Sequence, residues 1–238
     1  MNTNKTALVT GANKGIGFAI AEQLGNHGFT VAIGARDDGR RAVAVENLRG
    51  KGIDAFGVPL DVTSDASVAN AASLIAGTTG RLDVLVNNAG IGGNSAGGAQ
   101  DPTTLDLSVV HTVLDTNVFG AVRVTNALLP LLSAAPSPRI VNVSSNMGSL
   151  ELHTGPIMAA YAPSKAMLNA ITVQYARRFA DSNIIINVCC PGYVSTDFTG
   201  HNSARTPTQG AAIAVHLATL PDDGPRGGFF DDSGPIPW

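Results

Sequence analysis

The sequence has few charged residues and few aromatic ones, and neither sign of charge dominates. Charged side chains make up 14% of the 238 residues, aromatic ones make up 5%, and the formal net charge is −3. Nucleic-acid-binding proteins usually carry a basic face, so we expect no nucleic-acid partner. No apolar run approaches the ~20 residues that span a bilayer, so we expect no membrane partner either.

Cysteine is scarce as well, because the chain has only Cys189 and Cys190. Neighbouring side chains in an extended strand point to opposite faces, which disfavours a disulfide between these two. Free thiols are typical of a reducing cytosol. Residues 1–5 lead directly into the first expected strand. We therefore expect no signal peptide and a cytoplasmic protein.

Apolar residues are plentiful at 44%, and they are mainly Ala, Val, Leu and Ile. Short β-branched runs alternate with longer Ala- and Leu-rich stretches, which predicts alternating strands and helices. The expected strands are 6–10, 29–34, 55–60, 84–87, 139–144, 184–189 and 228–230. The expected helices are 15–27, 39–49, 66–78, 107–133, 160–180 and 208–219.

The expected strands are apolar on both faces, as in a parallel sheet that helices cover on both sides. Their alternation with helices implies right-handed crossovers, so we predict a doubly wound α/β fold of about seven parallel strands. No repeat, linker or charge run divides the chain, so we expect residues 1–238 to form a single domain. The Gly- and Ser-rich segment 90–102 is expected to be a loop beside the functional site.

A glycine-rich turn, Thr10-Gly-Ala-Asn-Lys-Gly-Ile-Gly17, follows the first expected strand. Its glycines permit a tight turn, close approach of the backbone to a pyrophosphate, and close helix packing. A helix N-terminus at this point attracts phosphate groups. The spacing differs from the G-x-G-x-x-G fingerprint. A glycine-rich turn without a ligand is therefore the alternative.

Tyr161 and Lys165 lie four positions apart, so they project from one face of the expected helix. An ammonium beside a phenol favours the phenolate, so we expect the pKa of Tyr161 to fall below its usual value of about 10. Such a tyrosine can exchange a proton with an oxygen atom. Similar pairs also occur on solvated helix faces, so the other motifs must decide between the two interpretations.

Together the motifs resemble those of the short-chain dehydrogenase/reductase family, and within it the NADPH-dependent carbonyl reductases. The resemblance extends from Thr10 to Gly192. It rests on the glycine turn, Asn-Asn-Ala-Gly at 87–90, Asn-Val-Phe-Gly at 117–120, Ser-Asn-Met-Gly at 145–148, Tyr-Ala-Pro-Ser-Lys at 161–165 and Pro-Gly at 191–192. It implies a doubly wound Rossmann fold.

The resemblance implies four catalytic residues: Asn117, Ser145, Tyr161 and Lys165. Tyr161 would supply a proton and Ser145 a hydrogen bond to the carbonyl oxygen, where negative charge develops. Lys165 would hold the nicotinamide ribose, and Asn117 would anchor a water near it. Ser144 competes with Ser145, although the Ser-x-x-Gly spacing favours Ser145. Ser145 as a backbone cap and Asn117 as a structural residue stay open.

The resemblance also implies contacts with NADP(H). The expected contact residues are Gly11, Asn13, Lys14, Gly15, Ile16, Gly17, Arg36, Arg40, Asp61, Val62, Asn88, Ala89, Gly90, Tyr161, Lys165, Pro191, Gly192, Val194 and Thr196. Among them Asp61 would contact the adenine, with capping of the next helix as its alternative. Thr196 would bond the nicotinamide carboxamide.

The end of the second expected strand predicts a preference for NADP(H). An NAD site usually places Asp or Glu there, against the ribose 2′-hydroxyl. The position corresponds to Ala35, and the next residue is Arg36, whose guanidinium can pair with a phosphate. A register slip of two residues would instead place Asp37 or Asp38 at the ribose, and Arg36 would be a solvated charge.

These residues predict an enzyme that reduces aldehyde or ketone carbonyls to alcohols with NADPH. The alternatives are an NAD-dependent alcohol dehydrogenase and a non-catalytic dinucleotide sensor, and the presence of Ser145, Tyr161 and Lys165 argues against the sensor. Tyr161 follows Ser145 by 16 residues, a few more than is common in the family. In many family members the helices that correspond to 107–133 and 160–180 carry the faces that form dimers and tetramers, and a long insertion before the tyrosine covers them in others. The addition here, near 152–157, is short, so the resemblance implies a homo-oligomer, with a dimer favoured.

The remaining polar and aromatic residues give weaker signals. His153, Tyr193 and Phe198 lie in segments expected to border the substrate, and plain loop packing is their alternative. The other histidines are His27, His111, His201 and His216, and they show no metal-ligand spacing. We therefore expect no metal site.

Overall fold

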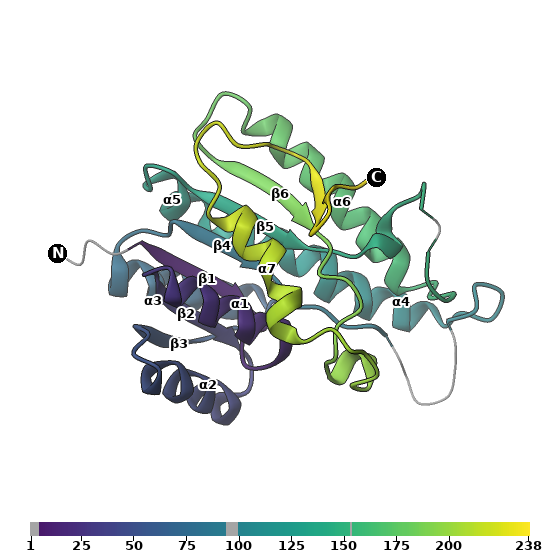
Figure 1. Cartoon of the computed structure of the whole chain (residues 1–238), viewed down its shortest axis with the longest axis horizontal. Coiled ribbons are helices and arrows are strands. Elements are labelled where there is room, and N and C mark those ends of the chain that lie inside the picture. The colour runs from purple at the N-terminus through teal and green to yellow at the C-terminus, as the bar shows by residue number, and fades with distance from the viewer. Residues whose placement is uncertain (1–4, 94–99, 153) are drawn as a thin grey trace.

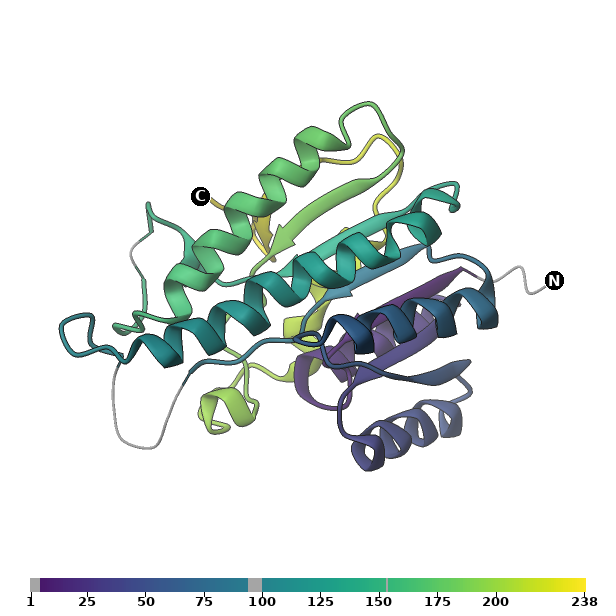
Figure 2. The same cartoon turned by 180° about the vertical axis from the view of Figure 1, so that it is seen from behind.

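The computed structural model describes residues 5–93, 100–152 and 154–238. In these residues a single eight-stranded sheet lies between two layers of helices (Figures 1 and 2). The strands are β1 (Thr6–Thr10), β2 (Thr30–Ala35), β3 (Ala55–Pro59), β4 (Val84–Asn87), β5 (Arg139–Val143), β6 (Ile185–Cys189), β7 (Phe229–Asp231) and β8 (Gly234–Pro235). Their order across the sheet is β3-β2-β1-β4-β5-β6-β7-β8.

The helices are divided between the two faces of the sheet. They are α1 (Gly15–Asn26), α2 (Asp38–Gly50), α3 (Asp65–Thr79), α4 (Leu107–Leu114), α5 (Gly120–Ser133), α6 (Tyr161–Arg178) and α7 (Pro207–Ala218). Figure 1 shows α1, α2 and α7 on the near face, and Figure 2 shows the helices of the opposite face, α3 to α6.

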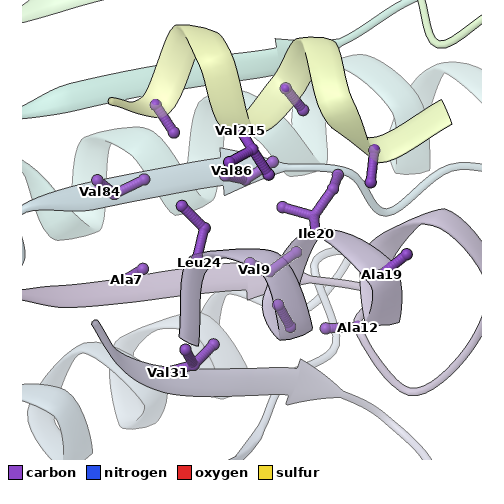
Figure 3. Close-up of a cluster of buried hydrophobic side chains, with 14 of the residues drawn as sticks. Ala7, Val9, Ala12, Ala19, Ile20, Leu24, Val31, Val84, Val86 and Val215 are labelled. Atoms are coloured by element: carbon purple, nitrogen blue, oxygen red, sulfur yellow. The ribbon is translucent and has the colours of Figure 1, made fainter. Parts of the chain in front are cut away.

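Alternate residues of each central strand face opposite helix layers. Ala7 and Val9 of β1 pack in the cluster that contains α1 and α7, whereas Leu8 packs in the cluster formed with α3 and α5. Figure 3 shows Ile20 and Leu24 of α1 within the first cluster. Two buried faces explain why the strands are continuous apolar runs rather than alternating ones.

The strand order places a topological switch point at the carboxyl ends of β1 and β4. The chain leaves β1 toward β2 on one side, whereas β4 pairs with β1 on the other side. In open parallel sheets, ligands bind in the crevice at such a switch point. The segments that follow β1, β4, β5 and β6 all lead to this edge, and they contain most of the motifs described above.

The predicted doubly wound α/β fold is confirmed, and β1 to β7 are parallel as expected. Two details differ from the expectation. An antiparallel two-residue strand, β8, extends the edge beside β7. The single helix expected over 107–133 contains a π-helical segment, Asp115–Phe119, between α4 and α5. Hydropathy periodicity does not reveal one extra residue within a turn.

Candidate active site

The glycine turn forms a cradle between β1 and α1. Gly11 and Gly15 have φ angles of +66° and +58°, which favour glycine. A Cβ on Gly17 would lie 2.4 Å from Asn88 Nδ2 and 2.5 Å from Gly11 O, so only glycine lets α1 approach this closely. Among the described residues no side chain caps the first turn of α1, where Lys14 is the N-cap. Its N–H groups suit a pyrophosphate, so the cradle fits a dinucleotide.

The segment after β4 is held against this cradle by hydrogen bonds. Asn88 Nδ2 donates to the carbonyl oxygen of Thr10 at 2.9 Å. The backbone N–H groups of Asn88 and Ala89 donate to Thr10 Oγ1 at 3.0 and 2.9 Å. A Cβ on Gly90 would lie 3.6 Å from Lys165 Nζ, so the segment runs from the glycine turn to the Tyr–Lys pair.

Ser145, Tyr161 and Lys165 come together at the carboxyl edge of the sheet. Ser145 lies two residues beyond the end of β5, and Tyr161 is the first residue of α6. Lys165 Nζ lies 5.6 Å from the centroid of the Tyr161 ring and donates to the Val143 carbonyl oxygen at 2.9 Å. All three thus lie where β5 meets the start of α6.

The competing Ser144 faces away from this group. Its side chain is buried and donates to Asn169 Oδ1 at 2.7 Å. Ser145 is half-buried, and its Oγ accepts a hydrogen bond from the N–H of Met147 at 3.2 Å. The capping role considered for Ser145 is therefore present, and it coexists with the contact to Tyr161.

The expected fall in the pKa of Tyr161 is wrong. Burial raises the pKa of Tyr161 from 10.0 to about 12, and the adjacent Ser145 hydroxyl, which favours the phenolate, offsets only part of that rise. The ring is 9% exposed and packs against Phe198, with 5.2 Å between the ring centroids. Desolvation of the phenolate thus outweighs the charge of Lys165 at this separation.

Burial also governs Lys165. It lowers the pKa of the ammonium from 10.5 to about 8, so most molecules still carry the charge at pH 7. The thiols of Cys189 and Cys190 lie nearby, and both are free and buried. Burial holds the pKa of each thiol above its usual value, so they stay neutral beside the lysine.

Asn117 lies buried in the π-helical segment. Its Oδ1 accepts from the N–H of Ile91 at 2.8 Å. Its Nδ2 donates to the Ile91 carbonyl oxygen and to Ser164 Oγ, both at 3.0 Å. Both ends of the amide therefore bind protein groups, which supports the structural alternative for this side chain while keeping it beside Gly90 and α6.

Arg36 directly follows Ala35, the last residue of β2, and is exposed. The carboxylates of the next two residues, Asp37 and Asp38, bind groups at the start of α2. Asp37 is the N-cap and accepts from the N–H of Arg40 at 2.8 Å, and Asp38 pairs with Arg41 at 2.5 Å. Arg40 Nε lies 3.7 Å from Asp37, so its charge is shared with that carboxylate.

Asp61 follows β3 and is near Arg36. Its Oδ1 accepts hydrogen bonds from the N–H and the hydroxyl of Thr63 at 3.0 and 2.7 Å. Partial burial raises the pKa of Asp61, but the bonds from Thr63 and the charge of Arg36 bring it below its ordinary value. The N-cap of α3 is Ser64, so the capping alternative for Asp61 is wrong. Val62 beside it is buried.

The segment after β6 returns to the glycine turn. Gly192 has a φ of +77°, Val194 is buried, and the methyl group of Thr196 would lie 3.4 Å from a Cβ on Gly15. Lys14 forms an ion pair with Asp197. The glycine turn is thus linked across the crevice to the segment that carries Phe198 over Tyr161.

Several contributors were not evident from the sequence. Gln100 and Ser164 have buried side chains that bond the start of α6, and Arg205 Nε donates to the Pro191 carbonyl oxygen at 2.8 Å. Gln100 and Arg205 act on residues that are 61 and 14 positions away, so no local motif marks them, and Ser164 lies within the Tyr–Lys motif without a role that its spacing indicates. Tyr193 is 61% exposed, and His153 lies outside the described residues.

In residues 5–93, 100–152 and 154–238, no group of three or more His, Cys, Asp or Glu side chains could hold a metal ion. The helices of these ranges also include none long and apolar enough to cross a membrane.

Comparisons with known proteins agree with this geometry. The family model described as short chain dehydrogenase matches residues 5–207. The chain is 35% identical to short-chain dehydrogenase/reductase 1 of Saponaria officinalis, over 94% of this chain and 93% of that protein. It is 32% identical to carbonyl reductase (NADPH) 1 of Bos taurus, over 100% and 99%.

A solved structure, the NADPH-bound carbonyl reductase from chicken fatty liver, superposes with a TM-score of 0.87 at 28% identity. The superposition covers 99% of each chain. The resemblance drawn from the motifs is confirmed, and the chain belongs to the short-chain dehydrogenase family of oxidoreductases.

Proposed function

We propose that this chain reduces aldehyde or ketone carbonyls to alcohols with NADPH. The observation that carries the proposal is the meeting of Ser145, Tyr161 and Lys165 beside the glycine cradle, at the carboxyl edge of the sheet. This arrangement provides a proton donor, a hydrogen-bond donor and a cation next to a site that fits a dinucleotide. Similarity to two proteins named as NADPH carbonyl reductases supports it.

The protonation state of Tyr161 favours the reductive direction. With a pKa of about 12, the phenol keeps its proton at neutral pH and can donate it to an oxygen that gains negative charge. Ser145 would donate a second hydrogen bond to the same oxygen and stabilise that charge in a site with little water. Lys165, largely charged at pH 7, adds a positive potential below the phenol.

The cofactor would be held along the crevice. A bound reduced nicotinamide supplies the hydride. The glycine turn (Gly11, Asn13, Lys14, Gly15, Ile16 and Gly17) would bind the pyrophosphate, and Asp61 and Val62 would lie at the adenine. Asn88, Ala89 and Gly90 would border the middle of the cofactor. Lys165 would hold the ribose hydroxyls, and Pro191, Gly192, Val194 and Thr196 would flank the ring.

The preference for NADPH would rest on Arg36. It follows β2 without an acidic residue at the strand end, and both following carboxylates are engaged by α2. An exposed guanidinium at this place favours a ribose that carries a 2′-phosphate. Lys14 and Arg40 are each paired with an aspartate. To bind the 2′-phosphate as well, each would have to release its aspartate.

We also propose a cytoplasmic homodimer. Leu107, Phe119 and Met167, on or between the long helices of one face, expose 68%, 42% and 38% of their surface. Contiguous exposed apolar patches are typical of association surfaces, and the proposed dimer would bury these three side chains together. The two free buried thiols suit a reducing compartment.

A carbonyl panel tests the proposed activity. The purified protein is mixed with quinones, keto esters, steroids and short ketones, with NADPH or NADH, and the absorbance of the reduced nicotinamide is followed. We expect turnover with NADPH on at least one class. Tyr161→Phe, which removes only the hydroxyl, should lower kcat by about 10²–10⁴-fold and leave cofactor binding intact. Activity of this variant within a few fold of the wild type would refute the role of Tyr161.

A further inference from the structure

Helix α6, which begins at Tyr161, starts without a local cap. The residue before it is Ala160, which has no side-chain oxygen to accept from the first-turn N–H groups. Nearly all buried backbone N–H groups in proteins are paired. The start of α6 therefore needs an acceptor from elsewhere in the chain.

The buried side chain of Gln100 supplies that acceptor. Its Oε1 accepts from the N–H of Ala160 at 2.8 Å and from the N–H of Tyr161 at 3.0 Å. The N–H of Ala162 donates to the Met158 carbonyl oxygen, and the N–H of Ser164 to that of Ala160. Residue 163 is proline and has no N–H. With Gln100 in place, every N–H from residue 160 to residue 164 has a partner.

The other end of the same side chain binds the segment after β4. Gln100 Nε2 donates to the Gly92 carbonyl oxygen. The backbone of Gln100 pairs with Met158, and its carbonyl oxygen accepts from the N–H of Ala159 at 3.0 Å. Gln100 thus fixes the start of α6 relative to the segment that borders the cradle.

These bonds are part of a ring around Tyr161 that is made of hydrogen bonds and short stretches of backbone. The ring runs from Gln100 to the N–H of Tyr161, from the Tyr161 carbonyl oxygen to Ser164 Oγ at 2.6 Å, and from Ser164 to Asn117. Asn117 binds Ile91, the neighbour of Gly92, which closes the ring. The backbone of Tyr161 is held on both sides, by its own N–H and by its own carbonyl oxygen.

We propose that Gln100 is a positioning residue for the reaction: by capping α6 from a distant segment, it holds Tyr161 at the place from which its phenol reaches the substrate oxygen. The inference rests on the proposed function for its effect on turnover, but the hydrogen bonds themselves can be tested without it. A displacement of about 1 Å at a reacting group can cost on the order of 10²-fold in rate.

Three variants test the proposal. Gln100→Met keeps the length and apolar packing of the side chain and removes both its acceptor and its donor. Gln100→Glu restores an oxygen acceptor for the N–H groups of α6, at a helix end where negative charge is favourable. Ser64→Ala is the matched control, because it removes a helix cap on α3, where Ser64 accepts from the N–H of Ser67 at 3.3 Å.

At saturating NADPH we expect Gln100→Met to lower kcat by about 10- to 100-fold, with the KM for NADPH changed by less than about 2-fold. Gln100→Glu regains the acceptor for α6 but not the donor to the Gly92 carbonyl oxygen, so it should recover part of the lost kcat, and Ser64→Ala should keep the wild-type value. Wild-type kcat in Gln100→Met, or a loss in Gln100→Glu as large as in Gln100→Met, would overturn the proposal.

Amide hydrogen exchange gives a readout that needs no turnover. The N–H groups of Ala160 and Tyr161 should exchange at least about 10-fold faster in Gln100→Met than in the wild type, and at near wild-type rates in Gln100→Glu and Ser64→Ala. If the wild type reduces no carbonyl, the proposed function fails while this exchange pattern still supports the cap. Equal exchange in Gln100→Met and the wild type would refute the cap itself.

Discussion

Replacing Lys165 by methionine should change how the stability of the chain depends on pH. Burial lowers the pKa of Lys165 from 10.5 to about 8 in the folded chain, whereas the unfolded chain keeps the ordinary value. Below pH 8 both states bind the proton, and the buried charge lowers stability. As the pH rises through 8, the folded state loses the proton and the unfolded state keeps it until about 10.5. Stability from this group therefore rises between these two pH values.

The size of the effect follows from the pKa difference. Each pKa unit corresponds to about 1.4 kcal/mol, so the wild type should gain about 2–3 kcal/mol relative to Lys165→Met between pH 7 and pH 10. The raised pKa values of Tyr161, Cys189 and Cys190 act in the opposite direction at high pH, because the unfolded state loses those protons first. Tyr161 contributes equally in both proteins, whereas Cys189 interacts with the charge of Lys165, so the variant changes its pKa as well and the difference includes that smaller change. Loss of the bond to the Val143 carbonyl oxygen shifts the variant by a constant amount at every pH.

Urea unfolding at pH 7, 8, 9 and 10 measures this difference. The free energy of unfolding of the wild type minus that of Lys165→Met should rise as the pH rises, by the amount given above. Lys51→Met is the control, because the Lys51 side chain is 51% exposed and solvent screens its ion pair with Glu22. A constant gap between the wild type and Lys165→Met across this range would refute the claim that burial destabilises the charge of Lys165.

Two further predictions concern the cofactor and the assembly. Arg36→Ala should raise the KM for NADPH by about 10- to 100-fold, since a charge-assisted hydrogen bond contributes about 1.5–3 kcal/mol, and should change the KM for NADH little; equal effects on both cofactors would contradict the assignment. Light scattering at micromolar concentration should give twice the monomer mass of 24.3 kDa, and a single monomer peak would exclude the dimer.

The layers of the fold could be predicted because burial on both faces leaves continuous apolar runs in the sequence. Leu8 and Val9 are neighbours on β1 that pack on opposite sides of the sheet. Because helices cover both sides, both residues are apolar. The π-helical segment around Asn117 could not be predicted in the same way. One extra residue in a turn changes the hydrogen-bond pattern without changing which residues are apolar.

Site residues in the first turn of a helix were predictable where a local motif marks them, as at Gly17 and Tyr161. Gln100 has no such motif, because its partners lie 60 and 61 residues away and its role depends on a pairing between two loops. The ion pair between Lys14 and Asp197, 183 residues apart, is of the same kind. Contacts of this type arise only when the strand order brings separate loops to one edge.

The error over Tyr161 shows which effect a spacing rule omits. Spacing of four residues on a helix predicts that two side chains are near each other, and it treats their charges as though water surrounded both. In the folded chain the packing of Phe198 removes water from the phenol, and the rise from 10.0 to about 12 corresponds to about 3 kcal/mol against the phenolate. Lys165 is itself desolvated and its Nζ donates to the Val143 carbonyl oxygen, so its charge does not reverse a penalty of that size. The same burial that invalidates the expected pKa keeps the proton on Tyr161, the form that protonation of a carbonyl oxygen requires.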